Sequence, residues 1–341
     1  MRRTLLLTIC GLGLVVPSAA VAAGGPVPAI QGGSGVTVSA SPFRFVALAD
    51  HANTMFKVIW KRNGSVAYQN LIRGSFGVPA AAYDGSVTGL SADGGTLALV
   101  EIPRTYPPAR TRLLVLDPRS FSFKARITLR GFFAVDAISP TGRWLYLIQY
   151  RHPATNPADY AVRAYDLAAH RLLGKPVVDP REPDEKMQGY PITRTMSADG
   201  RWAYTLYGRP TGPPFIHALD TDTRTAFCVD LAMLANIDLS SAKLVLESAT
   251  TLSVENQGMP LALMNRRTFA VRPAASTPAP AASARRARSG RSHPSRAHPS
   301  QAKASDMWTF ALPLLAVLVG VALTAARRQR PRQDSNLRPT A

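Results

Sequence analysis

Residues 196–206 read MSADGRWAYTL, and this segment gives the clearest indication of the fold. It places Asp199 and Gly200 between a short segment that ends at Met196 and a run of aromatic and apolar residues that begins at Trp202. Glycine adopts the positive φ that a tight turn between antiparallel strands requires, and aromatic residues are common in strands. We therefore expect a β-hairpin here.

The same pattern occurs at two earlier places, as LSADGGTLALV in residues 90–100 and as ISPTGRWLYLI in residues 138–148. A weaker copy, SPFRFVAL, occupies residues 41–48. The turn glycines of the three clear copies are 48 and 58 residues apart. A recurring spacing of this size indicates that one structural unit is repeated along the chain.

A second pattern follows each clear copy. An apolar segment ends in an aspartate and another apolar segment begins shortly afterwards, so each unit gains a further hairpin. Four short strands per unit are typical of the blades of a β-propeller. We interpret the turn residues of both patterns as structural: Asp93, Gly94, Asp117, Gly142, Asp166, Asp199, Gly200 and Asp220.

These segments resemble the YVTN and WD40-like repeats of bacterial surface β-propellers, in which a Ser-Pro-Asp-Gly turn precedes a strand. The resemblance covers residues 38–272 and implies an all-β fold of the β-propeller class. About five blades fit the number of copies, with six or seven as alternatives, and an open β-sandwich of hairpins is a further alternative. The chain departs from the repeat where Thr141 replaces the turn aspartate.

Both ends of the chain carry features of targeting or anchoring. Residues 1–23 combine Arg2 and Arg3 with an apolar run and several small residues, which predicts a signal peptide. Residues 307–326 hold no charge and precede an arginine cluster, which predicts one C-terminal transmembrane helix. We therefore expect a single-pass protein of the cell membrane, with an extracellular N-terminal domain and a cytoplasmic C-terminus (type I topology).

Composition divides the rest of the chain. We expect an N-terminal linker in residues 24–37, the β-propeller ectodomain in 38–272, a stalk in 273–306 and a basic cytoplasmic tail in 327–341. The stalk is rich in Ala, Pro, Ser and Arg and cannot bury a hydrophobic core. It is therefore predicted to be a disordered spacer between the domain and the membrane.

The formal net charge of +19 is spread over segments of different kinds. From residue 273 onward there are 11 basic residues and 2 acidic ones, so about half of the excess lies outside the predicted domain. A nucleic-acid partner is therefore not expected. Cys10 falls in the predicted signal peptide and leaves Cys228 alone, so no internal disulfide is expected.

In a propeller, the loops between the second and third strands of each blade open on the same face as the connections between blades. Here these are the longer loops, including residues 151–159, so this face is the expected binding surface. Its candidate residues are Arg104, Tyr106, Arg110, Arg151, His152, Arg181 and Arg209. They suit an anionic polymer or an envelope protein, and a merely solvated rim is the alternative.

The sequence contains no recognisable catalytic motif. The histidines have no metal-ligand spacing and no serine lies in a nucleophile-elbow pattern, so neither metal nor cofactor is expected. Two functions remain open. The first is a non-catalytic binding or protein-interaction module at the cell surface. The alternative is a propeller-type hydrolase or lactonase, whose site would be assembled from separate blades and would leave no linear motif.

Overall fold

The computed structural model describes residues 29–30 and 34–274. The predicted signal peptide, the predicted membrane span and tail, and nearly all of the predicted stalk lie outside these residues. Within the described part, no helix is long and apolar enough to cross a membrane. Signal peptide, anchor and extracellular location therefore stay predictions.

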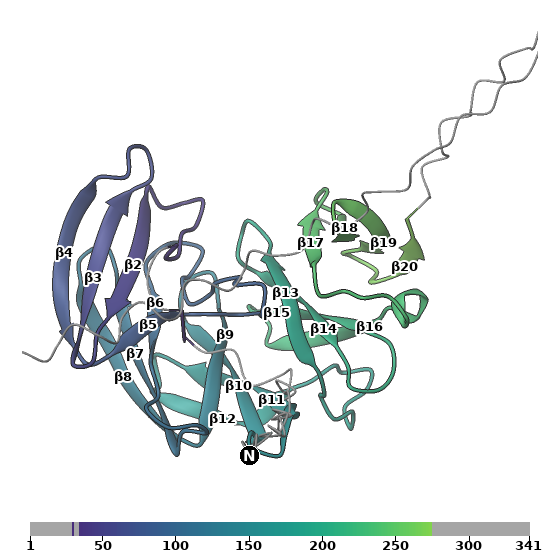
Figure 1. The fold of residues 1–341 in the computed structure, drawn as a ribbon, viewed down its shortest axis with the longest axis horizontal. Coiled ribbons are helices and arrows are strands. Elements are labelled where there is room, and N and C mark those ends of the chain that lie inside the picture. The colour runs from purple at the N-terminus through teal and green to yellow at the C-terminus, as the bar shows by residue number, and fades with distance from the viewer. Residues whose placement is uncertain (1–28, 31–33, 275–341) are drawn as a thin grey trace, which may run out of the picture. The chain divides into compact units, whose positions relative to one another are not determined.

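In the described residues, twenty strands form five antiparallel sheets that follow one another along the chain (Figure 1). The first sheet has three strands, in the order β2 (Phe43–Ala49), β3 (Asn53–Trp60) and β4 (Val66–Arg73). The second has five strands, in the order β1 (Ala29–Ile30), β5 (Phe76–Pro79), β6 (Leu97–Glu101), β7 (Arg110–Asp117) and β8 (Ser122–Arg130).

The other three sheets have four strands each, and every strand pairs with its neighbours in sequence. The third sheet contains β9 (Phe132–Ile138), β10 (Trp144–His152), β11 (Asn156–Asp166) and β12 (Arg171–Val177). The fourth contains β13 (Tyr190–Met196), β14 (Trp202–Gly208), β15 (Phe215–Asp220) and β16 (Thr225–Asp230). After a 3-10 turn, η1 (Ala232–Leu234), the fifth contains β17 (Ala242–Leu246), β18 (Thr251–Asn256), β19 (Met259–Asn265) and β20 (Val271–Pro273).

Four hydrophobic clusters hold the sheets together, and each lies between two sheets that are consecutive in sequence. Phe45 and Phe56 of the first sheet pack with Leu97 of the second, for example. The second and third sheets share a cluster, as do the third and fourth and the fourth and fifth. Central strands such as β15 are buried along their whole length because they are covered on both faces.

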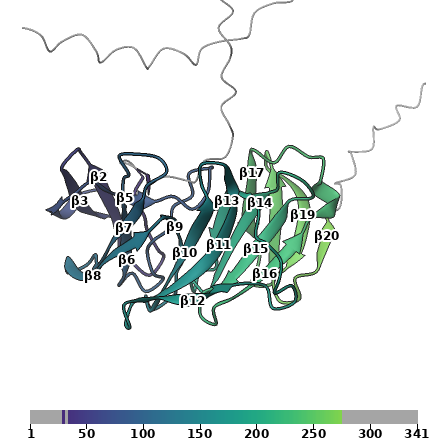
Figure 2. The same cartoon turned by 90° about the horizontal axis from the view of Figure 1, so that it is seen from below.

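Five sheets stacked face to face in chain order are arranged as propeller blades are (Figures 1 and 2). The predicted all-β architecture with about five repeated sheets is therefore confirmed at this level. Among the described residues, no hydrophobic cluster joins the first sheet to the fifth. In the described residues, the first and the fifth sheets are therefore the two end members of the stack.

The glycine turns of the second, third and fourth sheets meet at one end of the strands. Gly94, Gly142 and Gly200 have φ values of +69°, +76° and +73°. A Cβ atom on Gly142 would lie 2.1 Å from Oγ1 of Thr96, and one on Gly200 would lie 2.5 Å from Cβ of Ala92. The repeated turns are therefore packed against one another as well as within their own hairpins.

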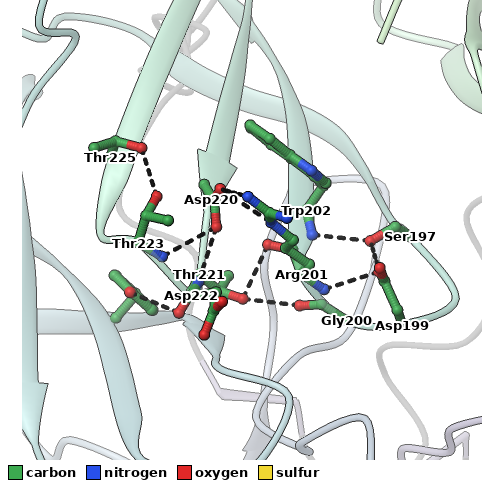
Figure 3. Close-up of polar contacts among 11 residues, drawn as sticks. Ser197, Asp199, Gly200, Arg201, Trp202, Asp220, Thr221, Asp222, Thr223 and Thr225 are labelled. Carbon is green, nitrogen blue, oxygen red and sulfur yellow. Dashed lines mark hydrogen bonds and ion pairs between the residues drawn. The ribbon is translucent and has the colours of Figure 1, made fainter. Parts of the chain in front are cut away.

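Figure 3 shows how two turns of the fourth sheet are tied together. The Ser197 hydroxyl donates to the Asp199 carboxylate and accepts the Trp202 N–H at 2.8 Å. The Arg201 guanidinium reaches Asp220 at 2.8 Å. Burial raises the pKa of Asp220, but Arg201 and two backbone N–H groups outweigh this and hold it below its usual value.

The remaining turn aspartates also bind groups of their own turns. Asp93 accepts the Gly95 N–H at 2.8 Å, and Asp166 accepts the N–H groups of Ala168 and Ala169, both at 3.0 Å. Asp117 accepts a hydrogen bond from the guanidinium of Arg119 at 2.9 Å. In these positions a carboxylate replaces the strand hydrogen bonds that the turn interrupts.

The first and second sheets differ from the expected four-stranded unit at their innermost strands. In the first sheet, the expected innermost strand is reduced to a single bridge between Val36 and Phe45. In the second sheet, the expected tight turn is preceded by an extra segment, so that residues 80–96 separate β5 from β6. This extra segment, residues 80–88, contacts the fourth and fifth sheets.

Candidate functional site

The end of the strands opposite the glycine turns is the loop face, defined by the connections 102–109, 153–155, 178–189, 209–214 and 231–241. Because antiparallel strands alternate in direction, these connections share one end. The prediction of a long loop at residues 151–159 is wrong. β10 continues through His152 and pairs it with Asn156, which leaves a short turn, because the residues that read as loop extend the hairpin.

The loop face near the second sheet contains a cavity of about 600 Å³, which we call the arginine cavity. Its lining includes Arg104, Tyr106 and Arg110, together with His51 and Phe132. Within the described residues, the side chains of Arg104 and Arg110 make no hydrogen bond or ion pair. Two arginines without a charged partner in this part of the chain therefore border one concavity, whose lining also includes the ion pair of Arg112 with Glu101. The excess of positive charge favours an anionic ligand.

Tyr106 is exposed but held in place. Its ring meets Phe132 edge-on, with centroids 5.6 Å apart and planes at 83°, and its hydroxyl donates to the carbonyl of Pro153 at 3.1 Å. The side chain nevertheless remains 54% exposed. It links the loop of the second sheet to the turn of the third and presents a fixed aromatic surface to solvent.

The other four predicted residues are engaged with acidic partners. Arg151 and His152 both contact Asp159, at 3.0 Å and 2.8 Å. Arg181 binds Asp179 at 2.6 Å, while Arg209 contacts Asp230 at 2.6 Å and Glu185 at 3.2 Å. All seven candidates lie at the loop face or on strands that end there. Only Arg104, Tyr106 and Arg110 share the arginine cavity.

The extra segment, residues 80–88, was missed by sequence reasoning. The N–H groups of Tyr83 and Asp84 donate to the carbonyls of Pro191 and Ile192 at 3.0 Å and 3.2 Å, which attaches the segment to the inner edge of β13. The Asp84 carboxylate also accepts a hydrogen bond from the Lys243 ammonium group at 2.7 Å. A segment of the second sheet therefore ties the fourth and fifth sheets together, and only the Asp84-Gly85 pair hinted at a turn there.

A second cavity of about 610 Å³, the tyrosine cavity, opens beside the extra segment. It is lined by Tyr83 and Tyr190, by Arg209, and by apolar residues that include Ile192 and Ile237. Burial raises the pKa of Tyr83 to about 12, and the nearby phenols of Tyr190 and Tyr106 add to this. Tyr83 still exposes 45% of its surface.

A buried polar cluster lies between the third and fourth sheets. Arg194 forms an ion pair with Asp136, both almost wholly buried, and donates from Nε to the Thr205 hydroxyl at 2.9 Å. His217 lies nearby on β15, and neither of its ring nitrogens has a hydrogen-bond partner. In the part of the chain that the structure describes, no three His, Cys, Asp or Glu side chains gather in a group suited to a metal ion.

Comparison with known proteins gives no family for the chain. No protein-family description matches it, and neither does any curated protein. The resemblance to YVTN repeats therefore stays a prediction.

Among solved structures, the chain is similar to hydrazine synthase of Kuenenia stuttgartiensis, with 13% identity, a TM-score of 0.35, and coverage of 73% of this chain and 78% of that one. It is also similar to TolB of Acinetobacter baumannii, with 11% identity, a TM-score of 0.31, and coverage of 71% and 73%. The β-propeller domain of Cps50 (Swd1) from Myceliophteria thermophila has 13% identity, a TM-score of 0.38, and coverage of 70% and 68%. The fold assignment rests on the five sheets themselves.

Proposed function

We propose that this chain is a non-catalytic binding module of the β-propeller type, held at the outer surface of the cell membrane by its predicted anchor. Its ligand is an anionic polymer of the cell envelope, and the loop face binds it. The observation that carries this proposal is the arginine cavity, where Arg104 and Arg110 have no acidic partner among the described residues.

Charge and shape support this assignment over a simple solvated rim. The three other arginines are paired with nearby carboxylates, for instance Arg209 with Asp230, so their charges are largely satisfied within the protein. His152 contacts the same Asp159 as Arg151. Arg104 and Arg110 instead border a concavity that also offers the aromatic side chains of Tyr106 and Phe132. Arginine and aromatic residues in a cavity are typical of recognition sites.

The test replaces both free arginines by alanine, R104A/R110A, in the full-length chain purified in mild detergent. We expect binding of inorganic polyphosphate, a simple linear polyanion, to weaken by about tenfold or more, because two charge-assisted contacts are lost. Raising the salt concentration should weaken wild-type binding further, since exposed charges are screened over about 8 Å at physiological ionic strength. Isothermal titration calorimetry measures both effects.

A matched control removes the same charge from another part of the surface. Arg171 and Lys175 are exposed on the edge strand β12, so R171A/K175A should bind polyphosphate as the wild type does. If both double variants lose affinity equally, the attraction comes from net charge alone and the arginine cavity is not the site.

A further inference from the structure

The arginine cavity and the tyrosine cavity are neighbours on the loop face. Ala80 lines the first and Tyr83 lines the second, and three residues of chain span at most about 11 Å. The phenol of Tyr106 contributes to the raised pKa of Tyr83, which is consistent with the two side chains lying near each other. The two cavities therefore form adjacent parts of one surface. Tyr106 lines the first with the two arginines, and Tyr83 lines the second with the apolar residues.

Both tyrosines are exposed aromatic rings on rigid supports. Tyr106 is fixed at its edge by Phe132 and at its hydroxyl by the Pro153 carbonyl. Tyr83 is fixed through its backbone, whose N–H donates to the carbonyl of Pro191. A ring that is already ordered loses little conformational entropy when a ligand packs on it. Such rings suit a ligand with flat apolar faces and polar edges.

We propose that the ligand of this surface is an acidic polysaccharide, whose sugar rings pack on Tyr106 and Tyr83 while its carboxylate groups bind Arg104 and Arg110. This inference rests on the proposed function and specifies its ligand class. A sugar ring has an apolar C–H face that packs on an aromatic ring by dispersion. A uronate sugar adds one carboxylate per residue, which a guanidinium binds in bidentate fashion.

A compact protein partner fits the geometry less well. The surface consists of two concavities of about 600 Å³ and 610 Å³, a size typical of sites for small molecules or single polymer chains. A stable protein interface requires about 800 Å² of complementary surface on each partner. A linear chain that crosses from one concavity to the other contacts both of them and the tyrosine that lines each.

The test compares two polyanions on the full-length chain in detergent: polygalacturonate, which has sugar rings, and inorganic polyphosphate, which has none. The variants are Y83L and Y106L, which keep apolar bulk but remove the flat ring. We expect each to weaken polygalacturonate binding about fivefold to tenfold and polyphosphate binding clearly less, because only the sugar chain packs on the rings. A thermal unfolding curve like that of the wild type shows that each variant is folded. Y83F and Y106F keep the ring and should bind polygalacturonate nearly as the wild type does.

Three results would overturn the proposal. If Y83L and Y106L leave polygalacturonate binding unchanged, or reduce binding of both polyanions equally, the rings do not recognise sugar. If the wild type binds polyphosphate through Arg104 and Arg110 but does not bind polygalacturonate, the ligand class is wrong while the arginine site stands. If neither polyanion binds, the proposed function fails as well.

Discussion

At the scale of single residues, His217 is a buried histidine to which the sequence assigned no role. Burial lowers its pKa to about 4, against the opposing effect of nearby Asp136. Both ring nitrogens lack partners, so the ring has neither a hydrogen bond nor a counter-ion of its own to favour the charged form. The neighbouring Asp136 is already paired with Arg194.

This burial predicts a pH dependence of stability. In the unfolded chain a histidine titrates near pH 6.5, whereas His217 in the folded chain stays neutral down to about pH 4. Below pH 6.5 the unfolded state therefore binds a proton that the folded state does not. The free energy of unfolding should fall between pH 6.5 and 4, by up to roughly 3 kcal/mol from this group.

Urea unfolding of the wild type and of H217L at pH 7, 5.5 and 4 measures this effect. The difference between the two free energies should change across this range, because H217L lacks the titrating ring. His51 is exposed, and H51L should follow the wild type. Parallel pH profiles for the wild type and H217L would show that the ring does not control acid stability.

At the scale of elements, the repeated glycine turns carry both backbone strain and tertiary packing. Gly142 and Gly64 have nearly the same φ, +76° and +73°. They differ in surroundings, since a Cβ on Gly142 would meet Thr96 at 2.1 Å while one on Gly64 would meet nothing within 4 Å. Alanine substitutions at these two glycines therefore separate the free-energy cost of a positive φ from that of a steric clash between sheets.

We predict that G142A destabilises the domain by about 2–4 kcal/mol and G64A by about 1 kcal/mol. Both variants force alanine into a left-handed conformation, but only G142A also pushes the turn of the third sheet away from that of the second. Thermal or urea unfolding of the two variants gives the comparison. Equal losses would mean that the turns of different sheets do not support one another.

Local patterns also explain which elements could be predicted from the sequence. The turn at Asp199-Gly200 and its relatives depend on backbone preferences of a few adjacent residues, and these are visible in the sequence. The extra segment was missed because its partners are remote: Asp84 binds Lys243, 159 positions along the chain. The end of β10 was misread because a hairpin extension and a loop can have the same composition near Pro153.

At the scale of the whole molecule, repetition predicted about five sheets because each unit needs the next to bury its apolar face. Repetition could also indicate the face on which long connections gather. It could not indicate which arginines there are neutralised, because this depends on carboxylates from other segments, as for Arg209 with Glu185 and Asp230. Three of the seven candidate residues share the arginine cavity, and that grouping required the structure.

Hydroxyl-radical footprinting of the full-length chain with and without polygalacturonate shows which face of the propeller binds the polymer. We expect protection of Tyr106 and Tyr83 on the loop face, with no change at Trp144 and Trp202, which follow the glycine turns at the opposite end of the strands. Phe123, 48% exposed on β8, should also be unaffected. Protection of Trp144 and Trp202 without protection of Tyr106 and Tyr83 would show that the polymer binds at the opposite end of the strands and not at the loop face.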